Sequence, residues 1–178
     1  MKILAILALV LMSFCSLAET ATSSVSSFNG VETLKLIKKY QGEEKTRFYK
    51  ATKYFSEEER KMFALRFNKR GLLVNADGTK FDTNGLKNDM ARFVIDSEGN
   101  IYSAYSDTIE VQHSSFVGGK DVVCAGYWDV GGGDIQLIND RSTHYISSDH
   151  KNLDSCIDYL KSRGMNFNDV AVIYSSDI

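Results

Sequence analysis

The sequence contains no proline among its 178 residues. Since proline makes up about 5% of an average protein, turns in this chain have to be formed by Gly, Asn and Asp. An excess of one charge is also lacking, because 21 basic and 23 acidic residues leave a net charge of −2. Proteins that bind nucleic acids carry a basic excess, so we expect no nucleic-acid partner.

No apolar run is long enough to span a membrane, which takes about 20 residues in a helix. The short apolar run Ile3 to Met12 follows Lys2 and precedes Ser16-Leu17-Ala18. A basic start, a short apolar stretch and a small-x-small ending are typical of a secretory signal peptide. We therefore expect residues 1–18 to be a signal peptide cleaved near Ala18. The mature chain would be secreted or periplasmic, with no membrane anchor.

Cysteine is scarce, with three residues in the chain. Cys15 would leave with the signal peptide, so that Cys124 and Cys156 remain as a pair. An oxidising compartment favours a disulfide between them. The alternative is two buried free thiols, each packed as a small hydrophobic side chain.

The residues that are present suffice for one domain with a hydrophobic core. A hydrophobic content of 43% with 25% charged residues excludes a disordered chain, a coiled coil and a multi-pass membrane protein. The Ser/Thr-rich residues 19–30 are predicted to form a flexible leader, and residues 31–178 a single domain.

The hydrophobic spacing predicts helices at the start of this domain. We expect short helices over Val31–Tyr40 and Thr46–Phe55, and a third that begins at the capping box formed by Ser56 and Glu59. Another helix is expected between Asp149 and Arg163, where apolar residues recur at i, i+3, i+4 and i+7.

The middle of the chain has the composition of strands joined by glycine-containing turns, one of them at residues 131–133. The expected strands are Phe63–Val74, Ala91–Ile95, Ile101–Tyr105, Asp121–Val130, Asp134–Asn139 and Val170–Tyr174. The predicted fold class is α+β, with N-terminal helices, a largely antiparallel β-sheet and one C-terminal amphipathic helix packed on the sheet.

Two histidines lie in polar clusters that could carry chemistry. His113 precedes Ser114 and Ser115, and His144 precedes Tyr145. Imidazole titrates near neutral pH, and a hydroxyl nucleophile needs a base to activate it. The alternative is a structural hydrogen-bond network.

The remaining candidates are weaker. The spacing of the three histidines, with Asp149 or Asp154 as further ligands, matches no compact metal motif, so we predict no metal site and no cofactor. The adjacent Tyr127 and Trp128 suit either a core or a binding surface.

Several segments resemble the conserved block of the plant IQ-motif-containing calmodulin-binding proteins and of related bacterial proteins of unknown function. The order and spacing of these segments match the family, and the resemblance extends from about Tyr40 to Tyr174. The segments are Phe93–Asp96, Gly99–Tyr102, His113–Gly119, Ala125–Gly126 and Ser142–Tyr145, with Lys53–Ser56 and Asp77–Thr83 upstream.

The chain departs from the family pattern in two respects that matter here. Thr143 replaces the glycine that precedes His144, and the IQ motif itself is absent. We therefore expect no IQ-type calmodulin binding.

The resemblance strengthens a site built from His113, Ser114, Ser115, His144 and Tyr145. We expect an exported bacterial domain that binds a ligand or protein through a polar cleft formed by these side chains. The alternative is a secreted, effector-like hydrolase or group-transfer enzyme. In that enzyme His113 or His144 would be the base, and Ser114 or Ser115 the nucleophile or a positioning hydroxyl. Tyr145 would be a proton donor or a substrate contact. A third interpretation is that the histidines only brace loops.

Overall fold

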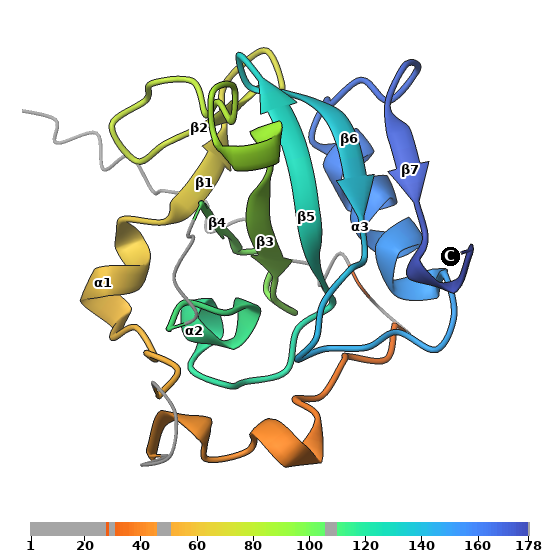
Figure 1. Ribbon diagram of the computed structural model, residues 1–178. Coiled ribbons are helices and arrows are strands. Elements are labelled where there is room, and N and C mark those ends of the chain that lie inside the picture. The colour runs from red at the N-terminus through yellow and green to blue at the C-terminus, as the bar shows by residue number, and fades with distance from the viewer. Residues whose placement is uncertain (1–27, 29–30, 46–50, 106–109, 178) are drawn as a thin grey trace, which may run out of the picture.

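Seven strands form one mixed sheet in the computed structural model of the chain (Figure 1). The structure describes residue 28 and residues 31–45, 51–105 and 110–177. The predicted signal peptide (1–18) and, apart from Phe28, the predicted leader (19–30) lie outside the described residues.

The sheet is antiparallel except for its last pair of strands. Its order is β2-β1-β4-β3-β5-β6-β7, and β7 runs parallel to β6. With α3 after the main strands, this arrangement confirms the predicted α+β class. The strands are β1 (Ala64–Phe67), β2 (Leu73–Val74), β3 (Ala91–Ile95), β4 (Ile101–Ala104), β5 (Cys124–Gly131), β6 (Asp134–Asn139) and β7 (Ala171–Ile173). The helices are α1 (Glu57–Lys61), α2 (His113–Val117) and α3 (Lys151–Ser162), with 3₁₀ turns η1 (Lys38–Tyr40), η2 (Glu43–Lys45), η3 (Lys87–Asp89) and η4 (Ser175–Asp177).

The helix predicted over residues 31–40 is wrong except for its last turn, η1. The preceding residues are extended, and Leu34 forms an isolated antiparallel bridge with Val122. In an extended chain Leu34 and Leu36 point to the same side, where both contact a hydrophobic cluster. Burial of this pair against the rest of the fold outweighs the local helical spacing.

The helix predicted over residues 46–55 is wrong in its described part, since residues 51–55 are not helical and residues 46–50 lie outside the described residues. The N–H groups of Lys53 and Phe55 donate to the carbonyl oxygens of Glu110 and Ser115. The segment therefore follows the chain around α2 instead of coiling on itself.

The single strand predicted over residues 63–74 is two strands. A turn at Asn68–Gly71 separates β1 from β2, which pair with each other. Gly71 has φ +76°, and a Cβ there would lie 2.4 Å from the carbonyl oxygen of Gly164. A side chain at this turn is excluded both by backbone strain and by space.

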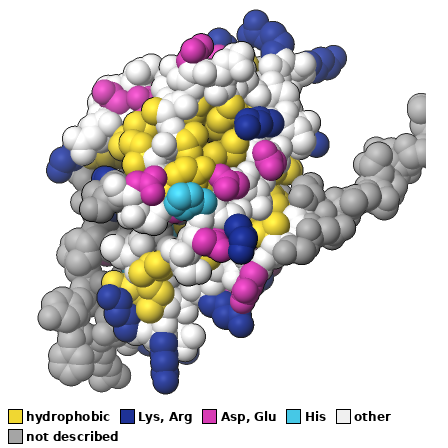
Figure 2. Space-filling model, turned by 90° about the vertical axis from the view of Figure 1, so that its right-hand side faces the viewer, with side chains coloured by type: hydrophobic (Ala, Val, Ile, Leu, Met, Phe, Trp, Pro, Cys, Tyr) yellow, Lys and Arg dark blue, Asp and Glu magenta, His cyan; other side chains and the backbone are white. Residues whose placement is uncertain are grey.

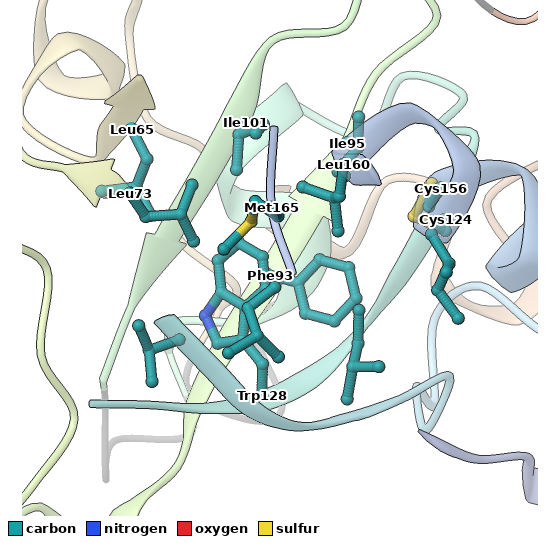
Figure 3. Close-up of a cluster of buried hydrophobic side chains, with 14 of the residues drawn as sticks. Leu65, Leu73, Phe93, Ile95, Ile101, Cys124, Trp128, Cys156, Leu160 and Met165 are labelled. Atoms are coloured by element: carbon teal, nitrogen blue, oxygen red, sulfur yellow. A yellow bond between two sulfur atoms is a disulfide. The ribbon is translucent and has the colours of Figure 1, made fainter. Parts of the chain in front are cut away.

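The sheet separates two hydrophobic clusters, because neighbouring strand residues point to opposite faces. Phe93 belongs to the larger cluster, on the side of α3, where its ring stacks on Trp128 with centroids 4.5 Å apart (Figure 3). Val94, the next residue, belongs to the smaller cluster, together with Phe116 of α2 and Tyr145. The polar clusters of the sequence thus lie on the side of the smaller core.

Helix α3 confirms the amphipathic pattern read from the sequence. Leu153, Cys156, Ile157 and Leu160 are buried. Cys156 forms a disulfide with Cys124 at the start of β5, beside Leu160 (Figure 3). The disulfide reading of the cysteine pair is therefore supported over the free thiols.

The side of the molecule that carries α3 and β7 has acidic and basic side chains interspersed around a hydrophobic area (Figure 2). Within the described ranges, no helix has the length and apolar character needed to cross a membrane.

We predict that replacing both cysteines (Cys124→Ala with Cys156→Ala) lowers the free energy of unfolding by about 3 to 4 kcal/mol. The disulfide closes a loop across a sequence separation of 32 residues and so restricts the unfolded chain. Urea unfolding of the double variant and the wild type, both without reductant, measures this loss. Equal midpoints would show that the cross-link contributes nothing.

Candidate functional site

The segment that carries His113, Ser114 and Ser115 is a short buried helix. All five residues of α2 are buried, and the helix ends at Gly118, whose φ of 61° is left-handed. At its start the Ser115 hydroxyl accepts a hydrogen bond from the backbone N–H of Gln112 at 2.9 Å. The structure therefore gives Ser115 a capping contact.

His113 is held at both ring nitrogens. Nε2 lies 2.8 Å from the carbonyl oxygen of Gly126, and Nδ1 lies 3.2 Å from the hydroxyl of Ser142. Because a carbonyl can only accept, Nε2 carries the proton and Nδ1 accepts from Ser142. The ring is 1% exposed, and burial lowers the pKa of His113 to about 3. The imidazole is therefore neutral at pH 7.

Ser142 connects His113 to the chain around His144. Its hydroxyl oxygen accepts from the backbone N–H groups of His144 and Tyr145, each at 3.2 Å, while its proton points to His113. One hydroxyl thus fixes the turn before His144 and ties it to α2.

Glu43 lies at the centre of a second group of hydrogen bonds, which includes His144. Its carboxylate oxygen Oε1 accepts from the hydroxyls of Ser114 at 2.5 Å and Tyr54 at 3.2 Å. Oε2 accepts from Thr52 at 2.9 Å and from Nε2 of His144 at 2.8 Å. The side chain is 9% exposed, so these four donors replace the water that a carboxylate would otherwise bind.

His144 lies between the Glu43 carboxylate and the hydroxyl of Thr143. Nε2 donates to Glu43, and Nδ1 accepts from Thr143 at 2.9 Å. The ring of Tyr40 stacks on the imidazole with centroids 4.0 Å apart. Burial lowers the pKa of His144 despite the nearby carboxylate, so this ring is neutral as well.

The side chain of Tyr145 does not join the hydrogen bonds around Glu43 and His144. Its side chain is fully buried in the smaller core, and its hydroxyl donates to the carbonyl of Lys120 at 2.8 Å. Burial raises the pKa of the phenol well above its usual value. The contact joins the loop after α2 to the loop before α3.

The structure thus links three of the five candidate residues, His113, Ser114 and His144, through Ser142 and Glu43. The Ser115 hydroxyl caps α2 instead, and the Tyr145 hydroxyl braces a separate loop. In the described part of the chain, neither Ser114 nor Ser115 donates to a histidine. The residue that the sequence analysis missed is Glu43, which lies 71 residues from Ser114 and 101 from His144. No local pattern links such distant residues. The available indication was that Ser114 and His144, once buried, would each need a hydrogen-bond acceptor such as a carboxylate.

Two surface recesses share Tyr127 and Arg141 in their linings. One, of about 460 Å³, is also lined by Ser142 and Thr143. The other, of about 420 Å³, is also lined by Asn139. Ser142 and Thr143 are therefore the points at which the buried histidine network reaches this surface.

The His/Ser block and its surroundings match a family model described as the IQ motif-containing protein middle domain, over residues 59–152. The chain belongs to this family. The match confirms the resemblance seen in the sequence and covers the segment from α1 to the start of α3. Neither a curated protein nor a solved structure matches the chain.

The family segment includes both histidines, whereas Glu43 lies before it. Among the described residues, no group of three or more His, Cys, Asp or Glu side chains is arranged to hold a metal ion.

We predict that acid destabilises the protein through His113. The unfolded chain takes up this proton near pH 6.5 and the folded chain near pH 3, so stability falls as the pH drops below about 6.5. Between pH 7 and pH 5 this one group accounts for a loss of about 2 kcal/mol. Urea unfolding at the two pH values measures it.

The His113→Gln variant should lose this part of the pH dependence. The exposed His150 offers the matched control, because His150→Gln removes a histidine and leaves the buried ring of His113 in place. If His113→Gln kept the wild-type slope, the buried neutral state of His113 would be refuted.

Proposed function

We propose that the chain is an exported bacterial binding domain that recognises its ligand at the surface around Tyr127 and Arg141. The observation that carries the proposal is the junction between the buried histidine network and the two recesses. Ser142 and Thr143 each bond to a histidine ring and also line the recess of about 460 Å³. The network therefore serves as the support of a binding surface.

A supported loop favours binding because little conformational entropy is lost when the ligand arrives. Ser142 is fixed from three sides, by His113 and by two backbone N–H groups. His144 is fixed by Glu43, by Thr143 and by the ring of Tyr40. The side chains that face the ligand thus extend from a preorganised backbone.

A larger recess, of about 700 Å³, lies between residues 31–35 and the start of α3. Its lining carries charges of both signs, including Asp149 and Lys151, which pair at 3.0 Å. In the described structure, none of its lining residues forms a hydrogen bond to the ring of His113 or His144. We therefore assign recognition to the Tyr127 surface.

Export is supported by the signal-peptide pattern of residues 1–18. The Cys124–Cys156 disulfide agrees with it, since such cross-links persist in oxidising compartments. Without an IQ motif, calmodulin binding of the IQ type is not part of the proposed function.

An enzyme is the second candidate, and one contact favours it. Thr143, His144 and Glu43 follow one another as hydroxyl, imidazole and carboxylate, and Thr143 is exposed. This order is that of a hydroxyl nucleophile with its base and orienting acid. The neighbouring N–H groups of His144 and Tyr145 already donate to Ser142, however, so they are not available to stabilise an oxyanion. We therefore place binding before catalysis.

We predict that small fragments bind around Tyr127. In an NMR screen with a library of aromatic, polyol and charged fragments, the largest shift changes should fall on Tyr127, Arg141 and Thr143. Replacing Tyr127 by Ala should weaken the best hits at least 10-fold, because the ring lines both recesses. Tyr102→Ala, a matched change of a partly buried strand tyrosine outside both linings, should leave them unchanged.

Hits confined to the recess beside α3 would overturn the proposal. If the wild type hydrolysed ester substrates from a panel and Thr143→Val did not, an enzyme would replace the binding domain as the proposed function.

Export gives a separate prediction. When the full chain is expressed in a bacterium, the protein recovered outside the cytoplasm should begin near Glu19, because the signal peptide is removed. Leu7→Arg should block this processing by interrupting the apolar run. Mass spectrometry of both forms measures the cleavage, and an uncleaved wild-type chain would contradict export.

A further inference from the structure

One face of the sheet is apolar at Val94 and Ala125 and becomes polar further along the same strands. Arg92, Tyr127 and Asn139 are direct cross-strand neighbours on β3, β5 and β6. They lie on the same face as Val94 and Ala125, the neighbouring pair that packs in the smaller core. The polar row therefore continues the covered part of the sheet out to the surface.

Asn139 has a buried side chain with an unused donor. It is 4% exposed, and its Oδ1 accepts from the backbone N–H groups of Tyr127 at 3.2 Å and Arg141 at 3.0 Å. These two contacts define which end of the amide is the oxygen. The Nδ2 group has no hydrogen-bond acceptor among the described residues, and Asn139 lines the recess of about 420 Å³. The Nδ2 atom itself is accessible to solvent, so an acceptor of a ligand can take the place of water there.

The charges around this recess have one sign. Lys87, Arg92 and Arg141 line it, and no Asp or Glu does in the described structure. Arg92 lies over the ring of Tyr127, 5.5 Å from its centroid. Lys87 and Arg141 form no ion pair with any described residue. The adjacent acid, Asp140, accepts from the backbone N–H of Ser175.

We propose that this recess binds an oxyanion, a carboxylate or phosphate group of a small molecule, between Arg141, Lys87 and Asn139. Arg141 offers a planar fork of donors, Lys87 a point charge and Asn139 an amide donor fixed by the backbone. The inference deepens the proposed function, on which it rests, by naming the chemical class of the ligand. A neutral polyol would leave both cations unpaired, and a cation would be repelled.

Two anions serve as probes and separate the two chemistries. Inorganic phosphate and succinate are titrated into the labelled full chain at constant ionic strength, with chloride as the reference anion. We expect saturable binding in the millimolar range or tighter, with shift changes centred on the Asn139 amide group. The anion that binds more tightly identifies the group that the site takes.

Three variants test the residues. Arg141→Gln should weaken binding at least 10-fold, whereas Arg70→Gln, a matched change of an exposed arginine outside the recess, should leave it unchanged. Lys87→Gln should weaken it several-fold. Asn139→Asp keeps an oxygen for the two backbone N–H groups but turns the donor into a repelling oxygen, so it should abolish binding. Urea unfolding of each variant verifies that it folds, and Arg141→Gln decides the question should Asn139→Asp not fold.

Two outcomes would overturn the inference. One is the absence of saturable binding by either anion, and the other is an equal affinity of Arg141→Gln and Arg70→Gln. If neutral fragments still mapped to Tyr127 in those cases, the oxyanion site alone would fail. If nothing bound there, the proposed function would fail with it.

Discussion

The buried carboxylate of Glu43 holds together parts of the chain that the sheet does not join. An ionised carboxylate is costly to bury, and it is tolerated when hydrogen bonds replace its hydration. Glu43 receives four, from Thr52, Tyr54, Ser114 and His144. These donors belong to the segment before α1, to α2 and to the loop after β6. A single side chain therefore fixes three segments against one another.

The neutrality of both histidines follows from this packing. His144 donates to Glu43 and accepts from Thr143, so both ring nitrogens are used without a second proton. His113 reaches the same state with a carbonyl and a hydroxyl. Burial lowers the pKa of both rings because the charged form would lose its hydration. The family segment, residues 59–152, carries the two histidines, and the carboxylate comes from the chain before it.

The sequence allowed correct predictions wherever structure is decided within a few residues. The capping box of Ser56 and Glu59 starts α1, and the apolar spacing around Cys156 forms α3. The helix predicted over residues 31–40 failed because Leu34 pairs with Val122, a contact that local spacing cannot encode. The candidate site could likewise be predicted only in part. The polar clusters at His113 and His144 are visible in the sequence. Their link through Glu43 depends on the tertiary fold.

The histidine network is buried, whereas the recesses around Tyr127 lie at the surface. This difference bears on where a ligand would bind. The rings of His113 and His144 have no unsatisfied nitrogen, since each nitrogen already has a partner in the described structure. Asn139, on the strand next to that of Tyr127, has a side-chain donor, Nδ2, without a partner among the described residues. A ligand gains most where a protein group lacks a partner, because no existing bond has to be broken first. On this ground we propose the polar row of the sheet, rather than the histidines, as the surface that contacts a ligand.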